Sequence, residues 1–462
     1  MKITEYIKKV NDSQLDVVEE THKAIEEIRK INDEYHYLNT ISEQLAIEQA
    51  KQVAKDPKKR LAGLMVTVKD NICVKGVEST AGSAILKGYK PLFNATVMEN
   101  LIKEGAIVLG KTSQDEFGFG SFNLNVGKGF FVPKNPFDKE RVCGGSSGGS
   151  AGITSKVSFA HASIAESTGG SIETPANFCG VVGVCPTYGT VSRYGLIDYA
   201  NSFDKIGPMT KTVDEAQFLL GFMQSKDPRD STSVGFPDKK VQVKTVGIDY
   251  SLIELCDKEV QKACYAAEER LKGSGIKINK ISLPTVKEFG ISAYYILAMS
   301  EASTNLAKYC GMRYGASSKI EEGFNEYFSK VRSEQFGKEA KRRIMLGTFA
   351  RMAGYRDAFY VKAAQVRQKI ILEYKKQLND CQAIMTPTIA IGAPKIDEVS
   401  KLSPLDHYRM DVMTVGPNLA GLPHMSVPVH GASSQPGGVM MIADHFAESA
   451  MFDCAKRVEN NK

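Results

Sequence analysis

The sequence predicts an α/β protein with a central mixed β-sheet covered by helices on both faces. Short runs rich in Val, Ile and Leu alternate with longer segments whose apolar residues recur at helical spacing, and such alternation is typical of a sheet packed between helices. The chain has 462 residues, of which 42% are hydrophobic and 24% are charged, so it can bury a large core. We find no fixed-period repeat and no linker, and we therefore expect a single domain.

The first sixty residues are predicted to form a helical layer. Ser13 can cap a segment with apolar residues at helical spacing, and Ser42 can cap a helix over residues 43–55. The pattern then changes, because residues 64–68 form an apolar, β-rich run that fits a buried strand and places Lys69 at its end. A polar residue at the end of a buried strand is well placed for chemistry.

Helices and strands continue to alternate along the rest of the chain. Apolar spacing and glycine positions predict helices over residues 95–104, 213–223, 258–272, 291–309, 338–378 and 447–458, and strands over residues 106–109, 245–248, 276–283 and 383–385. These elements supply both the sheet and the helices that cover it.

The composition disfavours several classes of protein. No stretch approaches the ~18 apolar residues that would span a bilayer, and the start MKITEYIKK lacks the apolar core of a signal peptide. The nine cysteines form no CxxC pair and the seven histidines show no metal-ligand spacing, which favours reduced thiols and no bound metal. The net charge of +6 is a weak basic bias that decides nothing about partners. We expect a cytoplasmic protein without membrane contact.

Two segments match enzyme motifs in their letters but not in their context. Residues 105–112, GAIVLGKT, fit the Walker A pattern, yet the residues that should form a phosphate-binding loop are predicted to be a strand. Residues 144–148 and 148–152 fit the G-x-S-x-G elbow, but a polar, turn-like stretch precedes them and no histidine stands in a local acid pattern. ATP binding at this segment and a Ser-His-Asp hydrolase are therefore disfavoured.

Two turns of small residues, 144–150 (GGSSGGS) and 168–171 (TGGS), suggest one shared site. Glycine lets backbone N–H groups approach a ligand, and serine supplies a hydroxyl that can act as a nucleophile or carry a proton. A lysine can replace histidine as the base if its pKa falls from ~10.4 by about three units, which costs on the order of 4 kcal/mol. The context of Lys69 suggests such desolvation; a surface position with the amine in water is the alternative.

Together with Lys69, these turns resemble the signature of the amidase signature family, whose members use a Ser-cisSer-Lys triad. The matching stretches are residues 68–71 (VKDN), 144–150 and 168–172 (TGGSI). The resemblance implies that Ser171 is the acyl-forming nucleophile, that Ser147 relays its proton, and that Lys69 is the neutral base. It also implies an oxyanion hole of backbone N–H groups, contributed by Thr168, Gly169, Gly170 and Ser171.

Within that family, the chain resembles the A subunits of tRNA-dependent amidotransferases, in the stretches 178–183, 186–189, 191–196, 227–232 and 301–306. The resemblance implies that this chain hydrolyses glutamine and passes the ammonia to a B subunit, which uses ATP and Mg²⁺ to activate Glu-tRNA(Gln), Asp-tRNA(Asn) or both. It further implies a small C subunit, contact with the mischarged tRNA mainly through the B subunit, and no cofactor on this chain. The alternatives are a stand-alone amidase and a non-catalytic scaffold subunit.

Glutamine recognition offers a chemical test, because a zwitterion needs a cation for its carboxylate and an anion for its amine. Arg343 matches the family position for the carboxylate and is suited to bidentate pairing. Asp411 matches the position for the amine, and Tyr294 resembles the pocket-lining tyrosine. We then expect three parts within the single domain: a helical N-terminal layer (residues 1–60), a catalytic core (residues 61–235), and a glutamine-pocket and C-terminal part (residues 236–462).

The chain departs from the family around the predicted nucleophile. Ser167 stands where the family usually has Asp, and Glu173 and Thr174 stand where Arg and Gln are usual. Cys185 replaces a usual Lys, and Cys143 a usual Pro. These differences leave the predicted triad intact but change the polarity around Ser171.

Overall fold

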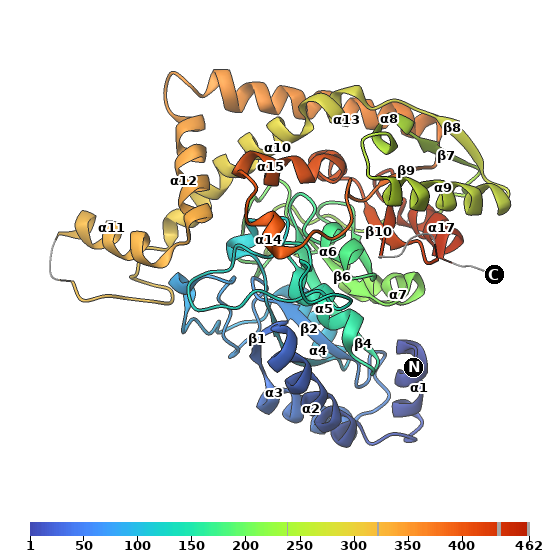
Figure 1. Cartoon of the computed structure of the whole chain (residues 1–462). Coiled ribbons are helices and arrows are strands. Elements are labelled where there is room, and N and C mark those ends of the chain that lie inside the picture. Colours follow the sequence, from blue (N-terminus) through green and yellow to red (C-terminus); the bar gives the residue numbers. More distant parts are fainter. Residues whose placement is uncertain (238, 321–322, 432–435, 460–462) are drawn as a thin grey trace.

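Eleven strands form one mixed β-sheet at the centre of the computed structural model, which describes residues 1–237, 239–320, 323–431 and 436–459 (Figure 1). Their order across the sheet is β1-β3-β2-β4-β6-β5-β10-β11-β9-β7-β8. The strands are β1 (Leu38–Ile41), β2 (Met65–Lys69), β3 (Ile107–Thr112), β4 (His161–Ser167), β5 (Val182–Cys185), β6 (Lys205–Thr210), β7 (Thr245–Ile248), β8 (Lys277–Lys280), β9 (Ala383–Pro387), β10 (His424–Pro428) and β11 (Gly438–Ala443). The predicted α/β architecture with a central mixed sheet is confirmed.

The position of β2 between β3 and β4 determines where the site lies. β2 is parallel to both neighbours, and its Val68 pairs with Ile164 of β4. The two strands then end at Lys69 and Ser167. Parallel strands place their carboxyl ends at one edge of a sheet, where ligands of α/β proteins commonly bind. Lys69 and the turn after Ser167 therefore lie at the same edge.

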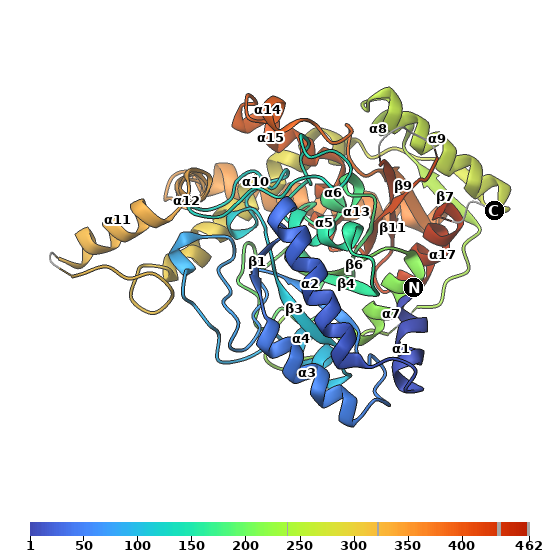
Figure 2. The same ribbon diagram turned by 60° about the horizontal axis from the view of Figure 1, so that its bottom comes forward.

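Helices flank the sheet, and every residue of β2, β3, β4, β6, β9, β10 and β11 is buried. Strands that are covered on both faces lack the alternation of apolar and polar residues. α2 and α3 pack beside β1 and β3, α10 packs against α12 and α13, and α11 projects from the body (Figures 1 and 2). The helices are α1 (Ile3–Asn11), α2 (Val17–Tyr35), α3 (Glu43–Lys55), α4 (Thr96–Lys103), α5 (Gly148–Lys156), α6 (Glu173–Phe178), α7 (Val213–Met223), α8 (Tyr250–Ile253), α9 (Lys258–Gly273), α10 (Pro284–Asn305), α11 (Phe324–Gln335), α12 (Lys338–Arg351), α13 (Lys362–Asp380), α14 (Ile396–Val399), α15 (Pro404–Arg409), α16 (Val415–Ala420) and α17 (Glu448–Glu459).

The cap of α2 differs from the prediction. The N-cap is Asp16, whose carboxylate accepts hydrogen bonds from two amides of the first turn. Ser13 is not the cap, because it lies in the preceding turn with a φ of 54°. Ser42 does precede α3 as predicted, but its hydroxyl donates to the backbone oxygen of Val108. A carboxylate at the helix start is a better acceptor for the free amides than a more distant hydroxyl.

Several other elements differ in extent from the prediction. The helical region expected over residues 338–378 is interrupted between α12 and α13. α10 begins at Pro284 rather than at residue 291, because proline is favoured in a first helical turn. The strand expected over residues 276–283 is confined to β8. β1 was not predicted, and it interrupts the segment of residues 1–60 that was expected to be helical. β4, β5, β6, β10 and β11 were not predicted either, because Gly, Ser, His and Pro dilute their apolar pattern.

The Walker A-like residues form β3 rather than a loop. Lys111 is buried in this strand, and its ammonium donates to the backbone oxygens of Asp70 and Ile72 and to Ser79 Oγ. These contacts give Lys111 a structural role beneath the site.

The nine cysteines are free thiols, and all but Cys310 are buried. Burial raises the pKa of several of these thiols, among them Cys73 to about 11. In the part of the chain that the structure describes, no helix is both long and apolar enough to cross a membrane.

Replacement of Asp16 by alanine is expected to lower the free energy of unfolding by about 1 kcal/mol, because first-turn amides of α2 lose their acceptor. Ser13→Ala, in the same segment but outside the cap, is the matched control and should change it by less than about half that amount. Equilibrium denaturation in urea measures both variants. Equal effects would contradict the assignment of Asp16 as the cap.

Candidate active site

Lys69 is fully buried at the end of β2, and its amine has three hydrogen-bond partners. Nζ lies 2.8 Å from Ser146 Oγ, 2.8 Å from the backbone oxygen of Glu166 and 2.9 Å from Glu166 Oε2. Glu166, near the end of β4, is also buried and forms an ion pair with the lysine. The expected burial of Lys69 is confirmed.

Ser146, and not Ser147, contacts Lys69, so the sequence-based choice of Ser147 is wrong on this point. The peptide bond between Gly145 and Ser146 is cis. The hydroxyl of Ser147 donates instead to the backbone oxygen of Glu166 at 3.1 Å, and the residue stands at the N-cap of α5. The two adjacent serines have nearly the same neighbours in sequence, so only the path of the backbone decides which hydroxyl faces the lysine.

The two glycine-serine turns lie side by side, as predicted. The amide of Ser147 donates to the backbone oxygen of Ser171 at 3.2 Å. This contact brings Ser171, which is 7% exposed, next to the turn that carries Ser146.

Side chains that pack over the second turn require glycine there. A Cβ at Gly169 would lie 2.4 Å from Tyr294 Cζ, and one at Gly170 would lie 2.4 Å from Thr414 Oγ1. The amide of Gly170, expected as an oxyanion donor, donates to Ser167 Oγ at 3.1 Å instead. The amide of Gly169 has no hydrogen-bond acceptor among the described residues, so it is available to a ligand.

A small cavity lies at Ser171 and brings together residues that are far apart in sequence. It is lined by Gly118, Gly120, Gly169, Gly170, Ser171, Tyr294, Tyr295, Arg343 and Asp411. The three residues predicted to bind substrate therefore line the same cavity as the predicted nucleophile.

Arg343 is held firmly at the wall of this cavity. Its Nη1 donates to Tyr199 Oη at 2.6 Å, and its Nε donates to Glu339 Oε1 at 2.9 Å. Aromatic rings also surround the guanidinium at 5.1 to 5.5 Å, where a ring face attracts a cation; they belong to Phe119, Tyr199, Tyr295 and Tyr408. The position of the cation is thus fixed before any ligand binds.

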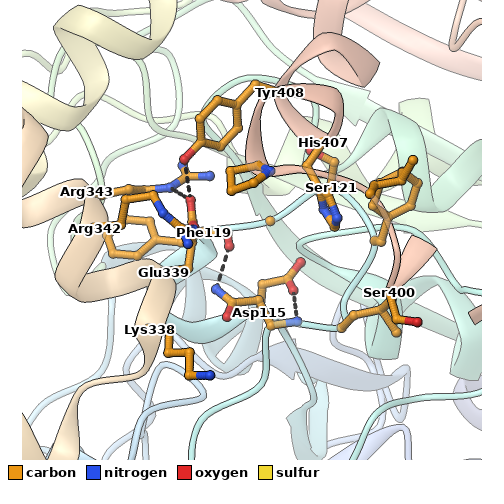
Figure 3. A pocket seen from close by; sticks show the side chains of 16 residues that line it. Asp115, Phe119, Ser121, Lys338, Glu339, Arg342, Arg343, Ser400, His407 and Tyr408 are labelled. Atoms are coloured by element: carbon orange, nitrogen blue, oxygen red, sulfur yellow. Dashed lines mark hydrogen bonds and ion pairs between the residues drawn. The ribbon is translucent and has the colours of Figure 1, made fainter. Parts of the chain in front are cut away.

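A second, wider pocket adjoins Arg343 and is shown in Figure 3. Lys338 and Arg342 of α12 line it together with His407 and Tyr408 of α15. Cationic side chains therefore predominate on the wall formed by α12.

Asp411 is buried, and Tyr295 Oη donates a hydrogen bond to its Oδ2. Burial raises the pKa of Asp411 to about 6, although hydrogen bonds from Tyr295 and Ser121 and the charge of Arg343 oppose the shift. The carboxyl group is therefore ionised above about pH 6 and neutral below it.

Three side chains of the site were missed from the sequence: Ser146, Glu166 and Tyr295. Ser146 and Tyr295 are immediate neighbours of residues that were identified, and their letters alone do not distinguish them. The sequence signal for Glu166 was weak: it is an acid near the end of an otherwise uncharged segment, but that segment lacks the clear apolar pattern that precedes Lys69.

Three of the departures from the family, Ser167, Glu173 and Cys185, lie in a buried polar cluster behind the turn that carries Ser171. Ser167 Oγ donates to Glu173 Oε2 at 3.0 Å, and Glu173 Oε1 lies 2.8 Å from His424 Nε2. Cys185 is close enough to form a set of three metal-ligating side chains with these two residues. Lys205 Nζ lies 3.5 Å from His424 Nδ1, and burial together with the charge of Lys205 lowers the pKa of His424.

A buried lysine paired with a serine, a second serine turn and a cavity with charges of both signs together define an amidase-like site. The chain belongs to the amidase family: the family model described as Amidase matches residues 17–452.

Its relatives are A subunits of glutamyl-tRNA(Gln) amidotransferases. The one from Archaeoglobus fulgidus is 41% identical over 470 residues, which cover 99% of this chain and 98% of the relative. The one from Persephonella marina is 41% identical over 435 residues, which cover 91% and 88%. The crystal structure of the Thermotoga maritima protein has a TM-score of 0.78 and 33% identity, and the match covers 100% of this chain and 95% of that one. The resemblance inferred from the motifs is confirmed.

Ser146→Ala is expected to lower the rate of amide hydrolysis by about a hundred-fold or more, because Lys69 loses its contact with the hydroxyl that is expected to carry the proton. Ser147→Ala removes the adjacent hydroxyl, which does not contact the lysine, and should lower the rate much less. Steady-state kinetics of the two variants measure the difference. A larger loss in Ser147→Ala would contradict the assignment of Ser146.

Proposed function

We propose that the chain is the glutamine-hydrolysing A subunit of a tRNA-dependent amidotransferase. The observation that carries this proposal is the pairing of Arg343 and Asp411 in the cavity that also contains Ser171. A cation and an anion at fixed positions suit the carboxylate and the amine of a free amino acid. A site for a simple amide has no need of both charges.

The proposed reaction begins with attack of Ser171 Oγ on the side-chain amide carbon of glutamine. The hydroxyl proton passes through Ser146 to Lys69, and the amides of Gly169 and Ser171 stabilise the oxyanion. Thr168 is a further proposed donor. The relay then returns the proton from Lys69 through Ser146 to the leaving nitrogen, so that the C–N bond breaks, ammonia departs and a glutamyl ester remains on Ser171. Water that is activated through the same relay then hydrolyses the ester to glutamate.

The names of the relatives support the proposed partners. The relatives are A subunits of glutamyl-tRNA(Gln) amidotransferases, so the ammonia from this chain is proposed to pass to a B subunit. That subunit would bind ATP, Mg²⁺ and the mischarged Glu-tRNA(Gln), Asp-tRNA(Asn) or both, with a small C subunit completing the complex. This chain would hold no cofactor and act in the cytoplasm.

Ser171→Ala tests the proposal in the assembled complex. Amidation of the mischarged tRNA with glutamine as donor should be abolished, whereas amidation with added ammonia should persist, because only the hydrolysis of glutamine needs the serine. Loss of both activities would indicate a structural role for the chain. Brisk hydrolysis of simple amides by the isolated wild-type chain would favour a stand-alone amidase.

The KM for glutamine is expected to rise as the pH falls below about 6, by up to about ten-fold per pH unit. Protonation of Asp411, whose pKa burial raises to about 6, removes the anion that attracts the substrate amine. Asp411→Asn should have a high KM that no longer varies between pH 5 and pH 8. A wild-type KM that is constant over this range would contradict the role of Asp411.

A further inference from the structure

We propose that Glu166 is the acid–base partner of Lys69: it takes a proton from the ammonium and so produces the neutral amine that acts as the base. This inference rests on the proposed glutamine hydrolysis and deepens it. Glu166 acts through the lysine, and is therefore a positioning residue rather than a residue that touches the substrate.

The hydrogen bonds of Lys69 show why such a partner is needed. An ammonium has three hydrogens, and the structure offers three acceptors: Ser146 Oγ, the backbone oxygen of Glu166 and Glu166 Oε2. While Nζ donates to Ser146 Oγ, it has no lone pair with which to receive a proton from that serine. The lysine must lose one proton before the relay can run towards it.

Only one of the three acceptors is basic enough to take that proton. Ser146 Oγ is a hydroxyl and the backbone oxygen is a peptide carbonyl, whereas Glu166 Oε2 belongs to a carboxylate. Transfer along the 2.9 Å contact breaks one N–H bond of Lys69 and forms one O–H bond on Glu166. The products are an amine and a carboxylic acid, so the net charge of the pair is unchanged. With side chains that are 0% and 1% exposed, loss of both charges also removes their desolvation cost.

The hydrogen bonds around Glu166 keep its carboxylate beside Lys69, as the charge partner of the lysine. Asn71 Nδ2 donates to Glu166 Oε2 at 2.9 Å. Thr168 Oγ1 lies 2.8 Å from Glu166 Oε1 and 2.8 Å from Asp204 Oδ1, and one hydroxyl hydrogen cannot serve two carboxylates. Burial and the charge of Glu166 raise the pKa of Asp204 well above its ordinary value. Asp204 also accepts the backbone amides of Tyr199 and Ala200, and of the two carboxyl groups on Thr168 it is that of Glu166 that contacts the lysine.

Other titratable groups around the pair have partners of their own. Asp115 accepts two backbone amides, and burial raises its pKa to about 6. Asp70, next to the lysine in β2, faces Lys111 of β3. Arg343 and Asp411 face the substrate cavity.

Glu166→Gln tests the inference, because glutamine has the same shape but cannot accept the proton. The measurement is kcat for glutamine hydrolysis from pH 5.5 to 9, with the full chain in its complex and glutamine saturating, so that Asp411 is covered by substrate. The wild-type kcat should vary by less than about two-fold between pH 6.5 and 9, because the transfer is internal. The kcat of Glu166→Gln should fall about ten-fold per pH unit below the pKa of its lysine, since that lysine must release its proton to solvent.

Glu215→Gln is the matched control. Glu215 is a buried carboxylate on α7 that accepts the amide of Ile3, far from the site. This variant should keep the wild-type pH profile. Glu166→Ser is a smaller replacement that also removes the carboxylate, and it should show the same slope if the glutamine variant proves unstable.

Two outcomes would overturn the inference. If kcat of Glu166→Gln is lower than that of the wild type but depends on pH in the same way, the role of Glu166 is purely structural. If the two profiles of kcat against pH coincide, the lysine loses its proton without Glu166. Absence of glutamine hydrolysis in the wild-type complex would instead overturn the proposed function, so the two failures are distinguishable.

Discussion

The burial of the Lys69 amine is the constraint on which the rest of the site depends. A charge removed from water must be paired and hydrogen bonded, and here the acceptors come from two separate segments, the turn before α5 and the end of β4. These acceptors reach the lysine only when β2 pairs in parallel with β4 and the GGSSGGS turn follows its native path. The contacts that satisfy the lysine also align it with the hydroxyl of Ser146. The folding that buries the lysine therefore also places it beside the serine that is proposed to relay the proton.

The residues proposed to bind the substrate come from the C-terminal half of the chain and converge on the cavity at Ser171. Tyr295 links the two charged groups of the cavity. Its hydroxyl donates to Asp411, and its ring lies 5.2 Å from the Arg343 guanidinium. One rigid side chain of α10 thus fixes the spacing of anion and cation. Its neighbour Tyr294 packs over Gly169, so the same helix also holds the turn that carries Ser171 in place.

Local pattern was sufficient for the elements whose apolar runs are unbroken, such as β2 with Lys69 at its end, β7 and α7. It also identified both small-residue turns, because clustered glycine and serine are typical of turns that approach a ligand. It could not choose between Ser146 and Ser147, because that choice depends on the backbone path and not on composition. Glu166 was missed because β4 has no clear apolar pattern, and the significance of its acid appears only when β2 and β4 lie side by side.

The central claim is that Ser171 carries the acyl group while Ser146 and Lys69 move its proton. Acid quenching of the complex during turnover of glutamine, followed by peptide mapping by mass spectrometry, tests this claim most directly. The account predicts a glutamyl ester on the peptide that contains Ser171, and none on the peptide that contains Ser146 and Ser147. A glutamyl ester on either of those two serines, or turnover without any ester, would contradict it.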